Sequence, residues 1–130
     1  MMHALFSAFD GAVLRRRLFK MDTVGDAYIC AAFAPAETPE SYDATVASIV
    51  GMCCDVLAVA GDMLSAVEEF RTGSGPAGGL QVGCRIGVSA GTVLCGALGR
   101  LQPRFHLFGP GLRAAELCEQ SGQEGCVHAR

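Results

Sequence analysis

The spacing of apolar residues predicts two helices separated by a β-hairpin in the first half of the chain. Apolar residues recur at three- and four-residue steps over residues 4–17 and again over 42–70, which is the period of an amphipathic helix. Between them, two strand-like runs flank Gly25-Asp26, a pair that suits a tight reversal between antiparallel strands. We therefore expect a hairpin that starts at Phe19, ends near Ala32 or Phe33 and carries Asp26 at its tip.

In the second half of the chain, the pattern of residues indicates a connection followed by strands and a final helix. Its glycine-rich start, residues 71–79, lacks the Gly-Lys-Ser/Thr ending of a phosphate-binding loop and is interpreted as a linker. The pattern then predicts a strand over residues 80–88 and a run of small residues punctuated by glycine over 89–99. A short strand with a turn is predicted over 102–111, and a helix over 112–120 that Gly122 would end. This order of elements favours an α+β layer fold.

Composition and length agree with a single domain. The chain has 130 residues, of which 51% are hydrophobic and 18% charged, so it can bury one core and is too short for two. A layered fold of this kind would hold a strand before the helix at residues 4–17, and none is predicted there. We therefore expect residues 1–130 to form one partial domain that lacks its first strand.

Charge and hydropathy argue against nucleic acid and membrane as partners. The net charge is -3 and the only basic cluster is Arg15-Arg16-Arg17, whereas binding to phosphates needs a basic face. The most apolar run, residues 44–61, contains Asp55, and an acidic residue at a membrane centre costs about 2.5 to 3.5 kcal/mol. We therefore interpret this run as a buried helix of a soluble domain, and expect no membrane contact by this segment and no nucleic acid partner. The start of the chain shows no secretory signal.

Seven cysteines form an odd set without a Cys-x-x-Cys pair. Their apolar neighbours predict small buried residues in a reducing compartment, not a disulfide framework. Cys126 and His128 supply only two ligands, so a metal site made of Cys and His is not expected.

Two carboxylates within the predicted hairpin invite a functional interpretation. Strict alternation would place Lys20, Asp22 and Val24 on one face of the first strand, and Asp is disfavoured inside strands. The residues alone leave two equal interpretations open. Either both carboxylates belong to a functional site, or Asp26 is a simple turn residue and Asp22 a solvated strand residue.

Four segments resemble conserved motifs of the class III nucleotidyl cyclases, the catalytic domains of adenylyl and guanylyl cyclases. Residues 21–28 resemble the pattern x-[E/K]-T-[I/V]-G-D-x-Y, and residues 85–93 resemble R-[I/V]-G-[I/V]-x-x-G-x-V. Residues 103–109 are similar to P-[R/Q]-[Y/F]-x-[L/I]-[F/W]-G, and residues 5–10 to L-[F/Y]-x-x-F-D. The four motifs occur in the order and with the spacing of the family, and together they span most of the chain.

The resemblance implies a ferredoxin-like α+β domain that forms head-to-tail dimers with a second cyclase protomer, with nucleotide sites at the interface. The implied reaction converts a nucleoside triphosphate into a 3′,5′-cyclic monophosphate and pyrophosphate with two divalent ions, Mg²⁺ or Mn²⁺. Asp26 matches one metal-binding Asp of the family. Asp22 and His106 match its two base-recognition positions. A carboxylate accepts the N1-H and N2-H donors of guanine, so Asp22 favours GTP over ATP. His106 as a purely structural residue is an equal alternative.

Departures from the family pattern concern the phosphates and the second ion. The family's other metal-binding Asp lies in a strand motif that has no counterpart here, since Phe9-Asp10-Gly11 belongs to the helix motif. The ribose-orienting Asn matches Arg113, and the Arg that stabilises the transferring phosphate matches Leu117. We expect that Arg113, one helical turn earlier, is the catalytic cation, with an exposed helix residue as the alternative.

These matches lead to one expected function and two alternatives. The expected function is a guanylate cyclase-like domain that makes cyclic GMP from GTP in cyclic nucleotide signalling. The alternatives are a catalytically impaired regulatory or dimerisation module, favoured by Arg113 and Leu117, and an adenylate cyclase acting on ATP. We expect a cytoplasmic location, either as a cytosolic enzyme or as the cytoplasmic domain of a larger membrane protein.

Overall fold

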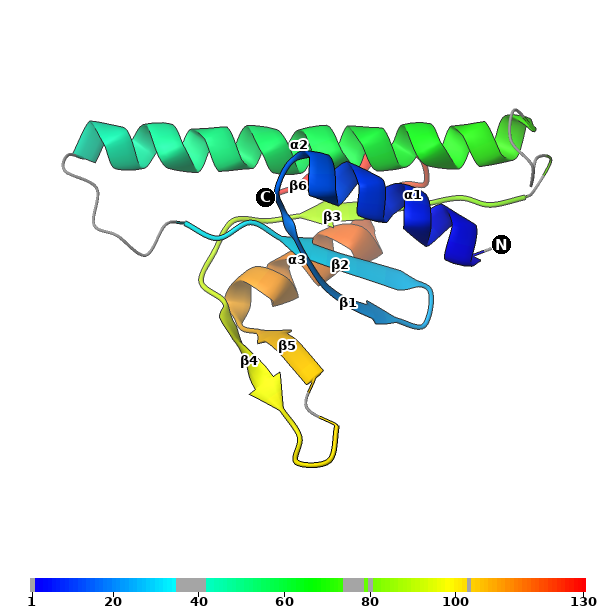
Figure 1. Cartoon of the computed structure of the whole chain (residues 1–130). Coiled ribbons are helices and arrows are strands. Elements are labelled where there is room, and N and C mark those ends of the chain that lie inside the picture. The colour runs from blue at the N-terminus through cyan, green and yellow to red at the C-terminus, as the bar shows by residue number, and fades with distance from the viewer. Residues whose placement is uncertain (1, 35–41, 74–78, 80, 103) are drawn as a thin grey trace.

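The chain folds as a mixed arrangement of helices and strands, and we describe it from a computed structural model that covers residues 2–34, 42–73, 79, 81–102 and 104–130. Figure 1 shows α2 along one side with α1 beside it, and β4 and β5 projecting from the other side. The elements in chain order are α1 (Met2–Arg15), β1 (Phe19–Val24), β2 (Ala27–Ala31), α2 (Tyr42–Thr72), β3 (Ile86–Val88), β4 (Leu94–Leu98), β5 (Arg104–Phe108), α3 (Pro110–Ser121) and β6 (Val127–Ala129).

The core forms where α1 crosses the second half of α2. Leu5, Phe9 and Val13 recur at four-residue steps within the first predicted helix and form one apolar stripe, which is buried. It packs against buried residues of α2, and partly buried Tyr28 and Cys30 of β2 close the cluster from the hairpin side. The stripe therefore packs on α2 and on the β1–β2 hairpin.

The first half of α2 is exposed, which the apolar pattern did not predict. All its buried residues, Val59, Ala60, Met63 and Val67, lie in the second half. Figure 1 shows the first turns of the helix extending beyond the other described elements. Large exposed hydrophobic side chains on this half include Tyr42, Val46, Ile49, Val50 and Leu57. The prediction of a buried helix is therefore wrong for this half, because three- and four-residue periodicity does not reveal whether a partner surface exists.

Length and composition alone would also let α2 cross a membrane. Its most apolar window has a mean hydropathy of 1.9, and 11% of that window is buried. Core helices of soluble proteins pass the same test, so this is weak support for a span.

The described strands form three two-stranded pairs. β1 pairs antiparallel with β2, β4 antiparallel with β5, and β3 parallel with β6. β4 lies inside the run of small residues, and β5 matches the predicted short strand. β3 is shorter than predicted, and β6 was not predicted at all. Most of the predicted linker lies outside the described residues.

Tight packing between β3 and α3 depends on Gly87. A Cβ added to Gly87 would lie 2.0 Å from the Ala115 carbonyl oxygen and 2.4 Å from the Glu119 backbone nitrogen. Both neighbours are backbone atoms that cannot rotate away, so only glycine allows this approach. The contact fixes α3 against β3, which lies within the second motif segment, residues 85–93.

Candidate functional site

The β1–β2 hairpin presents Asp26 at its tip. β1 ends at Val24 and β2 begins at Ala27, so Gly25 and Asp26 form a two-residue turn. Gly25 has a φ of 61°, a left-handed conformation that suits glycine at the first position of such a turn. Asp26 is exposed there. Carboxylate oxygens are the ligands that hard divalent cations prefer, so the turn can offer one ligand to such an ion.

A β-bulge at Met21 changes which face of β1 each side chain occupies. Lys20 pairs with Cys30 and Asp22 pairs with Ile29, so three residues of β1 oppose two of β2. Cys30 packs against the core. Its neighbour Ile29 points to the opposite face, since side chains alternate along a strand.

Asp22 therefore lies on the face that points away from α1, opposite to Lys20. The sequence prediction that Lys20 and Asp22 share a face is wrong because strict alternation fails at the bulge. Asp22 is half-buried, and its Oδ1 accepts a 2.8 Å hydrogen bond from the Thr23 backbone N–H. A carboxylate can accept further hydrogen bonds, so Asp22 keeps acceptor capacity for a ligand with paired donors.

His106 lies at the centre of β5, opposite Gly96 of β4. The ring is half-buried, and its centroid is 6.0 Å from that of Phe108. β5 lies in contact with β1. The fold therefore brings the two base-recognition candidates, Asp22 and His106, onto neighbouring strands although 84 positions separate them in the sequence (106 − 22).

Arg113 lies in the first turn of α3, directly after β5. Its backbone N–H donates a 3.1 Å hydrogen bond to the Gly109 carbonyl oxygen, which starts the helix. The side chain is exposed, and its Nη1 lies 3.4 Å from Glu116 Oε2. Exposed ion pairs of this kind contribute about 0 to 1 kcal/mol, so an anionic ligand can compete with Glu116 for the guanidinium.

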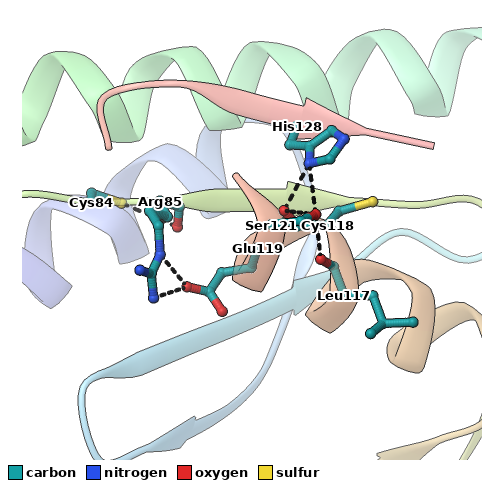
Figure 2. Close-up of polar contacts among 7 residues, drawn as sticks. All are labelled: Cys84, Arg85, Leu117, Cys118, Glu119, Ser121 and His128. Carbon is teal, nitrogen blue, oxygen red and sulfur yellow. Dashed lines mark hydrogen bonds and ion pairs between the residues drawn. The ribbon is translucent and has the colours of Figure 1, made fainter. Parts of the chain in front are cut away.

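Leu117 lies one helical turn after Arg113, and both residues therefore share a face of α3. The Leu117 side chain is exposed. Figure 2 shows it pointing away from the polar contacts that join α3 to β6. In the cyclase motif, this face of the helix carries the Arg that binds the phosphate. Here it carries Arg113 and the uncharged Leu117.

The start of α3 is held by close backbone contacts. The Ser89 hydroxyl donates a short hydrogen bond to the buried Gly111 carbonyl oxygen. A Cβ on Gly111 would lie 2.9 Å from Val93 Cγ1 and 3.2 Å from the Gly91 carbonyl oxygen. Small residues here let the segment after β3 approach the helix start, and this places Arg113.

The end of α3 is held by side chains that the sequence analysis did not single out as a cluster (Figure 2). Arg85 Nη2 and Nε each lie 2.8 Å from Glu119 Oε1. His128 of β6 places Nδ1 3.0 Å from the Cys118 carbonyl oxygen and 3.2 Å from Ser121 Oγ. The only sequence signals for this cluster were Arg85 in a motif and the lone His128, and neither reveals its partner.

A second polar cluster joins α1 to the hairpin. Asp10 of α1 accepts a 2.6 Å hydrogen bond from the Tyr28 hydroxyl and lies 2.8 Å from Lys20 Nζ. The Lys20 bond, with that of Tyr28, lowers the pKa of the Asp10 carboxyl, while burial and the bond to Asp10 raise the pKa of Tyr28. In the sequence, Asp10 stands out only as part of a helix motif, and nothing there reveals Lys20 and Tyr28 as its partners.

The cysteines differ from the sequence prediction in their exposure. All seven are free thiols, yet Cys53, Cys54, Cys95 and Cys126 are exposed. The prediction that they are small buried residues is therefore wrong for these four. Burial raises the pKa of Cys30 to about 11, which keeps that thiol protonated near neutral pH.

The described residues fit a divalent ion only in part. They contain no group of three or more His, Cys, Asp or Glu side chains that could hold a metal. Magnesium in nucleotide-dependent enzymes is held by one or two carboxylates together with substrate phosphates. Asp26 fits one such ligand, whereas the described part of a single chain does not provide a complete two-ion site.

Comparison with known proteins points to one family. The family described as "Adenylate and Guanylate cyclase catalytic domain" matches residues 1–130. Receptor-type guanylate cyclase gcy-20 of Caenorhabditis elegans is 29% identical over 129 residues, which are 98% of this chain and 10% of that protein. The chain therefore spans about a tenth of the length of this curated relative.

Two solved structures share the fold. The guanylate cyclase domain of RhGC from Catenaria anguillulae, in complex with GTP, aligns with a TM-score of 0.77 and 27% identity over 98% of this chain and 62% of that chain. A dimeric guanylyl cyclase domain of the RhoGC fusion protein from the aquatic fungus Blastocladiella emersonii aligns with a TM-score of 0.75 and 25% identity over 98% and 63%.

Proposed function

Because this chain belongs to the adenylate and guanylate cyclase catalytic domain family, we propose that it is a guanylate cyclase domain that converts GTP into 3′,5′-cyclic GMP and pyrophosphate. The observation that carries the choice of GTP is the position of Asp22 on the face of β1 that points away from α1, with His106 on the neighbouring β5. Both side chains are half-buried, so they are partly shielded from water and accessible to a flat ligand.

Guanine selection follows from hydrogen-bond complementarity. The N1-H and N2-H groups of guanine are two adjacent donors that one carboxylate can accept, and adenine offers an acceptor at N1 instead. His106 can donate from a ring nitrogen to guanine O6. A site whose buried polar group is left unpaired by the wrong base rejects that base strongly, so Asp22 disfavours adenine as well as binding guanine.

The ribose and phosphates are assigned to the hairpin tip and the start of α3. Members of this family generally use a divalent metal ion, which activates the 3′-hydroxyl and neutralises charge on the phosphates when bound. Asp26 would hold that ion through a carboxylate oxygen. Arg113 would orient the α-phosphate for in-line attack. Its guanidinium is available for this role because only a weak surface ion pair holds it.

We propose a second protomer as partner and a cytoplasmic location. A dimer places the nucleotide between two chains, and the second chain would supply groups that the described part of this chain lacks. The β4–β5 hairpin has exposed apolar residues suited to such a contact: Leu94, Leu98, Leu101, Phe105 and Phe108. Receptor-type relatives support a cytoplasmic domain of a larger membrane protein, without membrane contact by this segment.

The ferredoxin-like sheet with its first strand is part of the same proposal. Tyr28 and Cys30 of β2 and Ile86 of β3 pack against one core, yet β2 and β3 do not pair with each other. One further strand between them would join the two pairs into a single antiparallel-rich sheet.

Leu117 favours a second candidate function, a cyclase-shaped module without catalysis. An uncharged side chain at this position cannot stabilise the transferring phosphate, and loss of such an Arg costs about 10³ to 10⁵ in rate in comparable phosphoryl-transfer enzymes. In this alternative the chain regulates or dimerises with an active partner. Adenylate cyclase activity is the third candidate, because the family includes adenylate cyclases.

The direct test compares the chain with its Asp26→Asn variant for formation of cyclic nucleotide from GTP with Mn²⁺. We expect the variant to lose most of the activity, whereas Asp43→Asn, which changes another exposed carboxylate in the first turn of α2, leaves it unchanged. Normal folding and GTP binding without any product would favour the regulatory module.

A further inference from the structure

We propose that Asp10 is a positioning residue that determines which face of β1 carries Asp22. This inference rests on the proposed function, in which Asp22 reads the base. Asp10 lies on the far side of the strand from Asp22 and touches no part of the assigned site. It acts through Lys20 and Tyr28.

The carboxylate of Asp10 joins one helix to both strands of the hairpin. Its Oδ1 accepts a 2.6 Å hydrogen bond from the Tyr28 hydroxyl of β2. Lys20 of β1 places Nζ 2.8 Å from Oδ1 and 3.1 Å from Oδ2. Lys20 Nζ also lies 5.2 Å from the centre of the Tyr28 ring, within the range of a cation–π contact. The three side chains therefore form one closed cluster.

The cluster sits next to the bulge that sets the orientation of Asp22. Lys20 is the last residue of β1 before Met21, and Asp22 is the first residue after it. Tyr28 pairs with Thr23, directly after Asp22. The contacts of Asp10 therefore hold the strand on both sides of the extra residue.

Without this anchor the hairpin has a competing arrangement. Removal of the bulge would let Lys20 and Asp22 alternate regularly, and Asp22 would then share the α1-facing side with Lys20. A one-residue change in register moves every following side chain to the other face. The attraction between Lys20 and Asp10 favours the bulged register because it keeps Lys20, and not Asp22, beside α1.

Electrostatics add a penalty to the competing arrangement. An Asp22 side chain on the α1-facing side would approach the ionised Asp10 carboxylate, and like charges at short distance repel. Two interactions of Asp10 thus favour the strand pairing that presents Asp22 to a ligand: its attraction to Lys20 and its repulsion of Asp22.

The test uses Asp10→Ala in the chain, with Asp62→Ala as the matched control. Asp62 also lies on a helix, has the same 39% exposure as Asp10, and forms an ion pair with Arg15 at 3.6 Å. The first readout is the cross-strand NMR contacts of the pairs Asp22–Ile29 and Thr23–Tyr28. The second is the ratio of kcat/KM for GTP to that for ATP.

We expect Asp10→Ala to weaken the Asp22–Ile29 contact and to lower the GTP-to-ATP ratio of kcat/KM about tenfold, mainly through a higher KM for GTP. A misplacement of about 1 Å can lower the reaction rate up to about a hundredfold, so a tenfold change corresponds to a small displacement of Asp22. Tyr28→Phe should shift both readouts in the same direction by less. It also keeps the test possible if Asp10→Ala does not fold. Asp62→Ala should change neither.

The two proposals fail in different ways. Absence of turnover in the unmodified chain contradicts the proposed function, and the NMR contacts then still decide whether Asp10 sets the register. Unchanged contacts and an unchanged GTP-to-ATP ratio in Asp10→Ala overturn the positioning role. So does an equal effect of Asp62→Ala.

Discussion

The Tyr28 hydroxyl donates a 2.6 Å hydrogen bond to Asp10 Oδ1 and so ties β2 to α1. Tyr28 also places its ring 5.5 Å from Phe9 in a T-shaped arrangement and 5.4 Å from Phe6. The half-buried residue thus combines an aromatic contact to the core with a hydrogen bond at its hydroxyl, so that its polar tip is not left without a partner.

Removal of this hydroxyl should destabilise the fold modestly. Tyr28→Phe keeps the ring packing and loses one bond to a carboxylate that Lys20 still neutralises, so we expect a loss of about 1 kcal/mol in the free energy of unfolding. Urea denaturation followed by circular dichroism measures it. Tyr42→Phe, at a position 82% exposed, should have no effect. Equal stability of both variants would show that the Asp10 bond contributes nothing.

Stability should also fall at alkaline pH through Tyr28. Burial and the bond to Asp10 raise the pKa of Tyr28 above its ordinary value of about 10. The folded state therefore keeps this proton while the unfolded chain loses it, so the contribution to stability is complete below about pH 10 and declines as the pH rises further.

The comparison of Tyr28→Phe with the unmodified chain isolates this contribution. Between about pH 9 and pH 11 the variant should lose less stability than the unmodified chain. A residual decline is expected because burial also raises the pKa of Cys30 to about 11. Parallel pH profiles of the two proteins would contradict the role of Tyr28.

Gly87→Ala should be strongly destabilising. The new methyl group would meet the backbone of α3 at Ala115 and Glu119, and neither atom can move without a shift of the helix. Overpacking of this kind costs about 1 to 3 kcal/mol and occasionally more. Gly61→Ala is the matched control: its Cβ would meet nothing within 4 Å, and replacing a helical glycine by alanine stabilises by about 0.5 to 1 kcal/mol. Urea midpoints that shift in the same direction would refute this packing.

Leu117→Arg should raise turnover if the chain is a weakened cyclase. The substitution restores a cation one turn after Arg113, on the same face of α3, and such a cation contributes about 10³ to 10⁵ in kcat in comparable phosphoryl-transfer enzymes. Leu14→Arg adds the same charge on an exposed position of α1, away from the assigned site and from the β4–β5 hairpin, and should not change kcat. An unchanged kcat in Leu117→Arg would mean that Arg113 already supplies this charge or that the face does not meet the phosphates.

Local patterns in the sequence predicted the elements that depend on local chemistry. The Leu5, Phe9 and Val13 stripe, the turn at Gly25 and the long second helix all occur as expected, because periodicity and glycine conformation act within a few residues. The α+β class and the family resemblance are confirmed.

Features that depend on distant partners were not predicted. The bulge at Met21 is visible only once Lys20 and Asp22 are paired with β2, and strict alternation misplaced them. β6 has three residues and becomes a strand only through β3. The roles of Asp22, Asp26, His106 and Arg113 stay predictions.

Base selection by Asp22 can be measured from the products that form in an equimolar mixture of GTP and ATP with Mn²⁺. We expect cyclic GMP in large excess over cyclic AMP, and a reversal of this preference in Asp22→Lys, because an ammonium donates to adenine N1 and cannot accept from guanine. Excess cyclic AMP from the unmodified chain, or the same product ratio in Asp22→Lys, would contradict it.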